Sequence, residues 1–304
     1  MLTPRNAGAR PGLTLVELMV AVTVAGVVLS VLAVAALRQQ RFFLALVADA
    51  ALTGQLRDAA SVLPTDLRAA AVGSGDLREA TDTSIEVRET ISSGVVCDTL
   101  GQAVVLAPAA AGAATFAAVS ATIETGDAAW VFSPDDSVPT WREHKVLAVG
   151  STHPGQCSAG GPRLIGAALS APRTALTLDS IGQPWTSVGR PIRVTRPIRF
   201  SLYRATDGNW YLGARDWNNV TARFNAIQPL AGPFQSPAAG PLFRWVDSTG
   251  AALATPVVRR DQVALARIVL RGRTRASDHA LGAAWTSGPR GDSASISVAV
   301  RNRP

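Results

Sequence analysis

The chain has 304 residues, of which 47% are hydrophobic, and it contains 26 Gly and 19 Pro but few aromatic residues. This length allows one large domain or two small ones, and the composition indicates many loops and short strands. The formal net charge is +7, carried almost entirely by Arg because Lys145 is the only Lys. A basic balance of this kind excludes none of three partner classes, which are nucleic acid, anionic lipid and acidic protein.

The N-terminal segment begins with a basic stretch and continues as a long apolar run. Residues 1–12 contain Arg5 and Arg10 and no acid, and Glu17 is the single charged residue of residues 13–37. A helix over residues 13–37 extends about 37 Å, enough to cross a bilayer core of about 30 Å. A carboxylate inside a membrane helix costs roughly 3 kcal/mol or more, so Glu17 requires an explanation.

Two common kinds of N-terminal segment explain only part of this pattern. A cleaved secretory signal has an apolar stretch of about 7–15 residues and a small-x-small cleavage site. Residues 33–35 offer such a site, but the apolar run before them is too long and contains Glu17. A plain membrane anchor fits the length, and Arg5 and Arg10 would hold that end in the cytoplasm. It leaves Glu17 unexplained.

The stretch from Gly12 to Glu17, Gly-Leu-Thr-Leu-Val-Glu, resembles the processing site of type IV prepilins and pseudopilins. The resemblance implies a leader peptide at residues 1–12, cleavage by a prepilin peptidase between Gly12 and Leu13, and methylation of the new N-terminus. The family usually has Phe or Met after the cut, and Leu13 departs from this. Glu17 would then lie near the positive end of the helix dipole and could pair with the N-terminal amine of a neighbouring subunit.

Helical spacing continues beyond the apolar run. Apolar residues recur among polar ones up to Leu63, and Pro64 ends the pattern. The sequence therefore predicts a transmembrane and assembly helix over residues 13–63, apolar in its first half and amphipathic in its second. We expect the second half to pack on a globular domain.

Residues 64–304 are expected to form a periplasmic, β-rich globular domain. Alternating and apolar runs between turn residues predict short strands, and residues 207–209 predict a hairpin turn. The predicted strands cover residues 83–88, 104–106, 128–132, 146–149, 174–178, 198–203, 210–213, 243–247, 263–271 and 293–300. The predicted fold class is α+β, pilin-like, with one long N-terminal helix packed on an antiparallel sheet.

Short C-terminal pieces resemble a branch of the pilin family, the PilW-like minor pilins and J-type pseudopilins. They follow one another at residues 200–203, 208–212, 228–230, 242–245, 264–270 and 297–303, and the last piece reads Ser-Val-Ala-Val-Arg-Asn-Arg. Residues 107–190 carry no such resemblance.

Two cysteines, Cys97 and Cys157, fit one disulfide if the chain is exported and two idle thiols if it is not. Neither has a CxxC partner or a close His, so we favour a structural bridge over a reactive or metal-bound thiol. In the chain-entropy model, closing a loop of about 60 residues stabilises by roughly 4 kcal/mol.

The sequence contains no HExxH, Walker loop or Rossmann fingerprint, so we expect no enzyme, no cofactor and no metal site. Three His residues are scattered: His144, His153 and His279. A group of four acids could hold a cation, although we favour a solvated loop: Asp127, Asp135, Asp136 and Glu143.

Two groups of Arg residues lie in or next to predicted strands. A row formed by Arg267, Arg271, Arg273 and Arg275 stays on one face if the strand of residues 263–271 persists, and it could then contact DNA phosphates. It lacks interleaved aromatic residues for stacking on single strands, so we favour a solvated face or an interface with an acidic sister subunit. The second group divides between both strand faces: Arg190, Arg193, Arg196, Arg199 and Arg204.

The sequence therefore predicts a structural minor pilin, anchored once in the bacterial inner membrane and then built into a type IV pilus. The resemblance implies helix packing with other minor and major pilins. The size and the irregular middle of the chain favour a rare initiating or tip position. The alternatives are a J-type pseudopilin of a type II secretion system, a DNA-binding pilin for DNA uptake and a membrane-anchored hydrolase.

Overall fold

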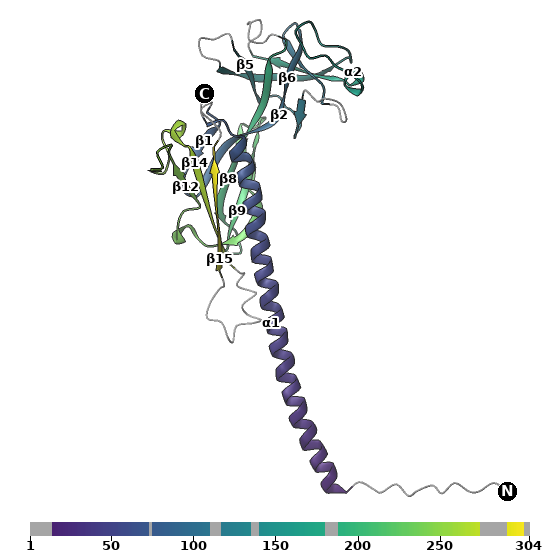
Figure 1. The fold of residues 1–304 in the computed structure, drawn as a ribbon, viewed down its shortest axis with the longest axis vertical. Coiled ribbons are helices and arrows are strands. Elements are labelled where there is room, and N and C mark those ends of the chain that lie inside the picture. Colours follow the sequence, from purple (N-terminus) through teal and green to yellow (C-terminus); the bar gives the residue numbers. More distant parts are fainter. Residues whose placement is uncertain are drawn as a thin grey trace, which may run out of the picture. The chain divides into compact units, whose positions relative to one another are not determined.

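A computed structural model describes residues 14–72, 75–109, 117–134, 140–179, 188–273 and 291–300. One long helix, α1 (Leu15–Ala69), is followed by strands β1 to β15, whose pairings are antiparallel (Figure 1). The predicted α+β class, with a long N-terminal helix and an antiparallel sheet, is confirmed.

The chain divides into two compact units, Met1–Ala51 with Thr274–Arg290 and Leu52–Arg273 with Gly291–Pro304. Of the first unit the structure describes residues 14–51, which form the first part of α1. The second unit holds the end of α1 and all the strands. The longer strands are β2 (Ser84–Leu100), β5 (Ala128–Ser133), β6 (Thr140–Thr152), β7 (Arg173–Leu178), β8 (Pro191–Arg204), β9 (Trp210–Asn218), β11 (Gln228–Phe234), β14 (Leu265–Arg273) and β15 (Gly291–Ala299).

The remaining elements are short, and the sequence patterns did not predict several of them. They are β1 (Leu77–Ala80), β3 (Ala103–Leu106), β4 (Ala117–Val119), α2 (Ala167–Ser170), β10 (Arg223–Phe224), η3 (Pro237–Ala239), β12 (Phe243–Val246), β13 (Ala252–Leu253) and η4 (Arg260–Gln262).

The helix ends later than the sequence predicts, because α1 continues past Pro64 to Ala69. A proline inside a helix removes one backbone hydrogen bond. Packing offsets this loss, since Leu63 and Leu67 are only 1% and 2% exposed and lie in one hydrophobic core. The Thr65 hydroxyl also donates to the Ser61 carbonyl at 3.0 Å. The prediction of a helix end at residue 63 is therefore wrong, because burial of the apolar stripe outweighs the proline.

The last turns of α1 pack on a sheet in which β1, β2, β8, β9, β11 and β14 are successive neighbours. The core between them contains Leu56 and Leu63 of the helix with Phe243 and Trp245 of β12. A Cβ at Gly272 would lie 2.5 Å from the Leu52 Cδ1. Glycine at this position of β14 therefore allows the helix to approach the sheet closely.

The middle of the chain is more regular than the sequence predicts. Strands β2, β3, β7, β6, β5 and β8 pair in that order, and β8 pairs again with β2, so that six strands close into a small barrel. Its interior is a separate core that includes Val104, Val131, Leu176 and Val194. The prediction of an irregular middle is wrong, because β3 pairs with β7 and β5 pairs with β8, and these partners are distant in sequence. Strands β2 and β8 belong to both the barrel and the helix-bearing sheet.

Candidate assembly site on the N-terminal helix

Glu17 lies in a capping box at the start of α1. The Thr14 hydroxyl accepts a hydrogen bond from the Glu17 backbone N–H at 3.3 Å, and the Glu17 carboxylate accepts from the Thr14 N–H at 3.0 Å. The Thr14 hydroxyl also donates to that carboxylate at 3.0 Å. This reciprocal arrangement satisfies backbone N–H groups that a helix start leaves without partners. It also places a negative charge at the positive end of the helix dipole.

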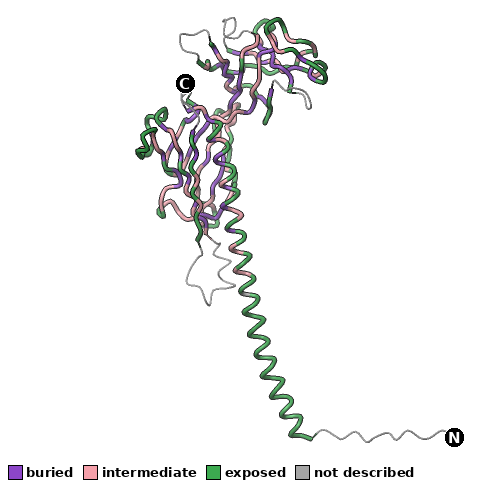
Figure 2. Tube along the Cα trace, viewed as in Figure 1, coloured by how far each residue is buried: buried purple, intermediate pink, exposed green. Residues whose placement is uncertain are grey.

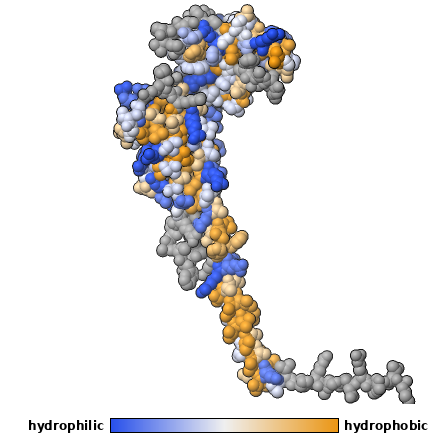
Figure 3. All heavy atoms as spheres, in the orientation of Figure 1, coloured by the Kyte–Doolittle hydropathy of each residue, from blue (hydrophilic) through white to orange (hydrophobic). Residues whose placement is uncertain are grey.

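The surface beside Glu17 is apolar and uncovered. In the described part of the chain, α1 is the one helix that is long and apolar enough to cross a membrane, and no residue of its most apolar window is buried. Figure 2 draws the first part of α1 as exposed, and Figure 3 shows the apolar surface along it. Exposed apolar side chains continue beyond Arg38, since Phe42 and Phe43 are each 66% exposed. A helix with this surface is stable only inside a membrane or against other helices.

Most of the Arg residues of β8 form ion pairs with acids of neighbouring elements. Arg193 contacts the fully buried Asp76 carboxylate at 2.6 and 3.1 Å, and Asp76 also accepts from the Ala71 N–H at 2.7 Å. The Arg193 guanidinium lies 5.1 Å from the ring centre of Trp130, which Arg88 also approaches at 4.6 Å. This group joins the end of α1 to the strands of the barrel.

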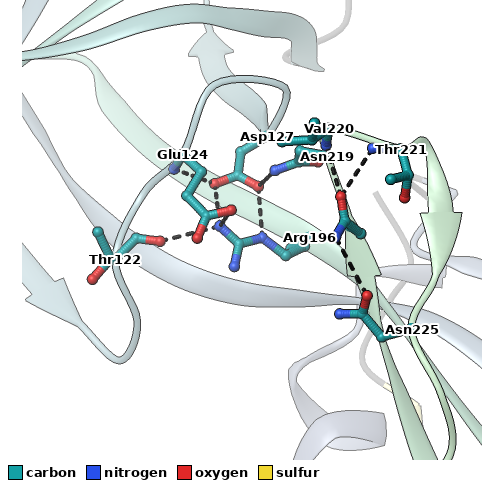
Figure 4. Close-up of polar contacts among 9 residues, drawn as sticks. Thr122, Glu124, Asp127, Arg196, Asn219, Val220, Thr221 and Asn225 are labelled. Carbon is teal, nitrogen blue, oxygen red and sulfur yellow. Dashed lines mark hydrogen bonds and ion pairs between the residues drawn. The ribbon is translucent and has the colours of Figure 1, made fainter.

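Arg196 and Asp127 form the centre of a second polar network (Figure 4). Asp127 accepts hydrogen bonds from Arg196 Nε and Nη2, both at 2.8 Å, and from Asn219 Nδ2 at 2.7 Å. These hydrogen bonds raise the pKa of Arg196 above its usual value. A Cβ at Gly126 would lie 2.9 Å from the Asn219 Cβ, and Gly126 has φ +99°, so both space and backbone favour glycine here. The network ties the loop before β5 to the loop after β9.

Of the acids predicted as a possible cation site, the two that the structure describes pair with different Arg residues. Asp127 pairs with Arg196, whereas Glu143 pairs with Arg88 at 2.9 Å. Asp135 and Asp136 lie outside the described residues. Within the described residues, no group of three or more His, Cys, Asp or Glu side chains could hold a metal ion.

The histidines are also separate from one another where the structure describes them. Burial lowers the pKa of His144, although Asp179 at 3.4 Å opposes that effect. The His153 carbonyl accepts a hydrogen bond from Arg173. His279 lies outside the described residues.

Three members of the predicted Arg row share one face of β14. Arg267 is exposed, whereas Arg271 and Arg273 are half-buried and donate to the Pro241 carbonyl at 3.0 Å and to Asn209 Oδ1 at 3.3 Å. Arg275 lies outside the described residues, as do Gly12 and Leu13 of the processing motif. Two of the three described guanidiniums are therefore partly engaged by the fold itself.

Cys97 and Cys157 form a disulfide with a Cα–Cα distance of 4.7 Å, the pairing expected from the sequence. Cys97 has no exposed surface, and Arg173 Nη1 donates to its sulfur at 3.6 Å. Arg173 also donates to the Gln156 carbonyl at 3.3 Å. The bridge and Arg173 together connect β2 to the segment between β6 and β7.

Sequence reasoning missed the partners of several of these residues. The capping box was readable, because Thr14-Leu-Val-Glu17 has the required Thr-x-x-Glu spacing. The Asp76–Arg193 pair carries no comparable local signal, since its members lie 117 residues apart.

Comparison with known proteins bears on the N-terminal segment alone. Residues 9–33 match the family model of the prokaryotic N-terminal methylation motif. No curated protein and no solved structure matches the chain. The matched residues include the Gly12–Glu17 stretch and most of the apolar run that α1 presents. This match supports a type IV pilin-like or pseudopilin precursor.

Proposed function

We propose that the chain is a structural, non-enzymatic subunit of a type IV pilus, similar to the PilW-like minor pilins. One observation carries the proposal. Glu17 is the single charge between residues 13 and 37, and it stands at the start of an apolar helix whose surface is otherwise uncovered. Such a helix supports insertion in a membrane and later packing against the helices of other subunits.

Processing by a prepilin peptidase would place the new N-terminal amine directly before Thr14 and close to Glu17. The basic leader, with Arg5 and Arg10, stays on the cytoplasmic side of the inner membrane in this proposal, and the second unit lies in the periplasm. The Glu17 carboxylate then has two roles. It caps its own helix, and it neutralises the amine of an adjacent subunit within the apolar helix bundle.

Head-to-tail contact between subunits does not close on itself and gives a helical fibre. Exposed Phe42, Phe43, Leu46 and Val47 extend the apolar surface of α1 past the membrane-spanning residues, which supports further helix contacts in the fibre. The second unit carries a barrel in addition to the helix-bearing sheet. A second unit of this size favours a position at the start or tip of the fibre over a repeated position in its shaft.

A J-type pseudopilin of a type II secretion system is the second candidate, because the same N-terminal motif serves both systems. Deletion of the gene separates them, since loss of motility or adhesion supports the pilus and loss of protein secretion supports the secretion system. DNA uptake is weaker as a function, because Arg271 and Arg273 already donate to groups of the fold.

Two variants of Glu17 test the assembly role. Glu17→Gln keeps an acceptor for the Thr14 N–H but removes the charge, whereas Glu17→Ala removes both. We expect both variants to leave the second unit folded and to lower incorporation into the fibre by about tenfold or more, the effect of losing a desolvated charge pair. Quantitative immunoblotting of sheared fibres against membranes measures incorporation. Normal incorporation of Glu17→Gln would show that capping alone is required.

Mass spectrometry of the protein from its native membrane tests processing directly. The expected mature chain begins with a methylated Leu13 and contains the Cys97–Cys157 bridge. Intact mature protein that begins at Met1 would refute the proposed function.

A further inference from the structure

Two edge strands of the helix-bearing sheet, β1 and β15, differ in length and regularity. β1 has four residues, and its pairing with β2 shifts register between Leu77 and Glu79. β15 has nine residues and pairs with β14 in one unbroken register from Leu265↔Ala299 to Arg273↔Gly291. A long, regular edge strand is a template for pairing with another chain.

The backbone of β15 presents its unused groups outward at alternate residues. The Val300 N–H donates to the Ala264 carbonyl at 3.1 Å, and these residues continue the β14–β15 register. The even-numbered residues of β15 therefore bond to β14, and the odd-numbered ones direct N–H and C=O away from it. Ser295, Ser297 and Ala299 are exposed, and their outward backbone groups have no partner within the described parts of the chain.

Natural edge strands usually carry a feature that prevents pairing, such as Lys, Pro or a bulge. β15 reads Gly-Asp-Ser-Ala-Ser-Ile-Ser-Val-Ala and has none of these. Asp292 is its one charged residue, and its carboxylate accepts the Ser293 N–H at 2.7 Å. Asp292 thus closes one end of the edge and leaves the stretch from Ser295 to Ala299 open.

The face beside this edge is basic. Arg267 and Arg271 on β14 lie directly opposite Ser297 and Ser293 on β15, so these four side chains share a face. Arg244 on β12 lies opposite Arg267 and adds a further positive charge. None of these guanidiniums has a carboxylate partner among the described residues. A strand added to β15 would lie two strand spacings, about 10 Å, from β14, within reach of Arg side chains.

We propose that β15 is a docking edge for an extended segment of a different protein subunit, which adds as a further strand and carries acidic side chains on the Arg face. Main-chain hydrogen bonds would supply the pairing, and the Arg face formed by Arg244, Arg267 and Arg271 would select the charge. A second copy of the chain fits less well, because antiparallel pairing of two β15 strands brings both Arg rows to the same face. The interface adds to the proposed function and does not depend on cleavage or on Glu17, so the two can fail separately.

A defined peptide probes the edge on the full chain in detergent micelles. The probe is a blocked nine-residue peptide of alternating Val and Glu, and its controls are the Val and Lys analogue and a backbone N-methylated Val and Glu peptide. Fluorescence anisotropy is expected to show saturable binding of the Val and Glu peptide, and hydrogen exchange is expected to show protection at Ser295, Ser297 and Ala299. The N-methylated peptide should bind about tenfold more weakly or not at all, because it cannot form the ladder.

Two sets of variants separate the contribution of backbone hydrogen bonds to peptide binding from the contribution of the Arg charge. Ser297→Pro removes an outward N–H that the fold does not use, and should weaken binding about tenfold, whereas Ser297→Ala should leave it unchanged. Arg267→Glu should weaken binding of the Val and Glu peptide about threefold and strengthen binding of the Val and Lys peptide, as expected for a partly exposed charge.

Three results would overturn the proposal. One is equal binding of the N-methylated peptide, which needs no change in the protein and so remains decisive if Ser297→Pro fails to fold. Another is equal binding of the acidic and basic peptides. The third is a dimer of the full chain that Ser297→Pro dissociates while the peptide does not bind, which would make the occupant a second copy.

Discussion

Asp76 and Asp127 are carboxylates without exposed side-chain surface, and each is held by one Arg of β8. Removing one member of such a pair leaves an uncompensated buried charge and typically costs about 3–5 kcal/mol. Their Arg partners are therefore fixed by the fold, although the sequence shows them only as part of a basic group. The local spacing of Arg residues cannot distinguish these buried pairs from the exposed Arg267.

Glu89 is a carboxylate whose environment disfavours its charge. Burial raises the pKa of Glu89, and the negative charges of Asp66 and Asp216 raise it further, against the opposing effect of Arg196. Burial also raises the pKa of Asp66. A raised pKa means that the folded state holds the proton more tightly than the unfolded state. Stability is then lost as pH rises from the unfolded pKa through the folded one.

We therefore expect Glu89→Gln to increase the free energy of unfolding at pH 7 and to leave it nearly unchanged below pH about 3, where the carboxyl is protonated in both states. Urea unfolding of the full chain in detergent at a series of pH values measures this. Asp66→Asn should act in the same direction, and the double variant should gain less than the sum because the two carboxylates repel each other. A loss of stability at pH 7 in Glu89→Gln would contradict this account.

At the scale of elements, α1 was readable from the sequence and its C-terminal end was not. The apolar run and Glu17 are local patterns, so residues 13–37 predict a membrane helix without knowledge of the rest of the fold. Pro64 is also local, but its effect depends on Leu63 and Leu67 being buried against the sheet. The strands in the middle of the chain were only partly predicted, because a short run such as β4 becomes a strand only through its partner β2.

Truncation of Leu63 tests whether its packing stabilises the part of α1 that continues past Pro64. We expect Leu63→Ala to lower the free energy of unfolding by about 2–5 kcal/mol, because a side chain that is 1% exposed leaves a cavity. Val62→Ala is the control, since Val62 is 38% exposed and its truncation should change stability by about 0.5 kcal/mol or less. Urea unfolding followed by circular dichroism compares the two. Equal effects would mean that the helix end is not anchored by this core.

On the scale of the whole molecule, the disulfide closes a loop of the barrel. The bridge joins residues 60 apart, and in the chain-entropy model such a closure stabilises by about 4 kcal/mol. We expect the free energy of unfolding of the double variant Cys97→Ser and Cys157→Ser to be lower by about that amount. Heat or urea unfolding, compared with the oxidised parent, measures this. Protection from amide exchange should be lost mainly in the barrel, whereas amide exchange in β14 should change little. A uniform loss of protection would mean that barrel and sheet unfold as one.

Residues 96–190, which hold most of the barrel, begin and end next to two paired residues. Val95 on β2 is paired with Pro191 on β8, and β3 to β7 all lie between these two residues. Paired residues of antiparallel strands lie about 5 Å apart, a gap that a tight turn spans. Residues 96–190 thus form a cassette whose removal would leave β2 and β8 as a plain hairpin. Exchange of this cassette would change the exposed surface of the second unit while leaving Glu17 and the helix that carries it unchanged.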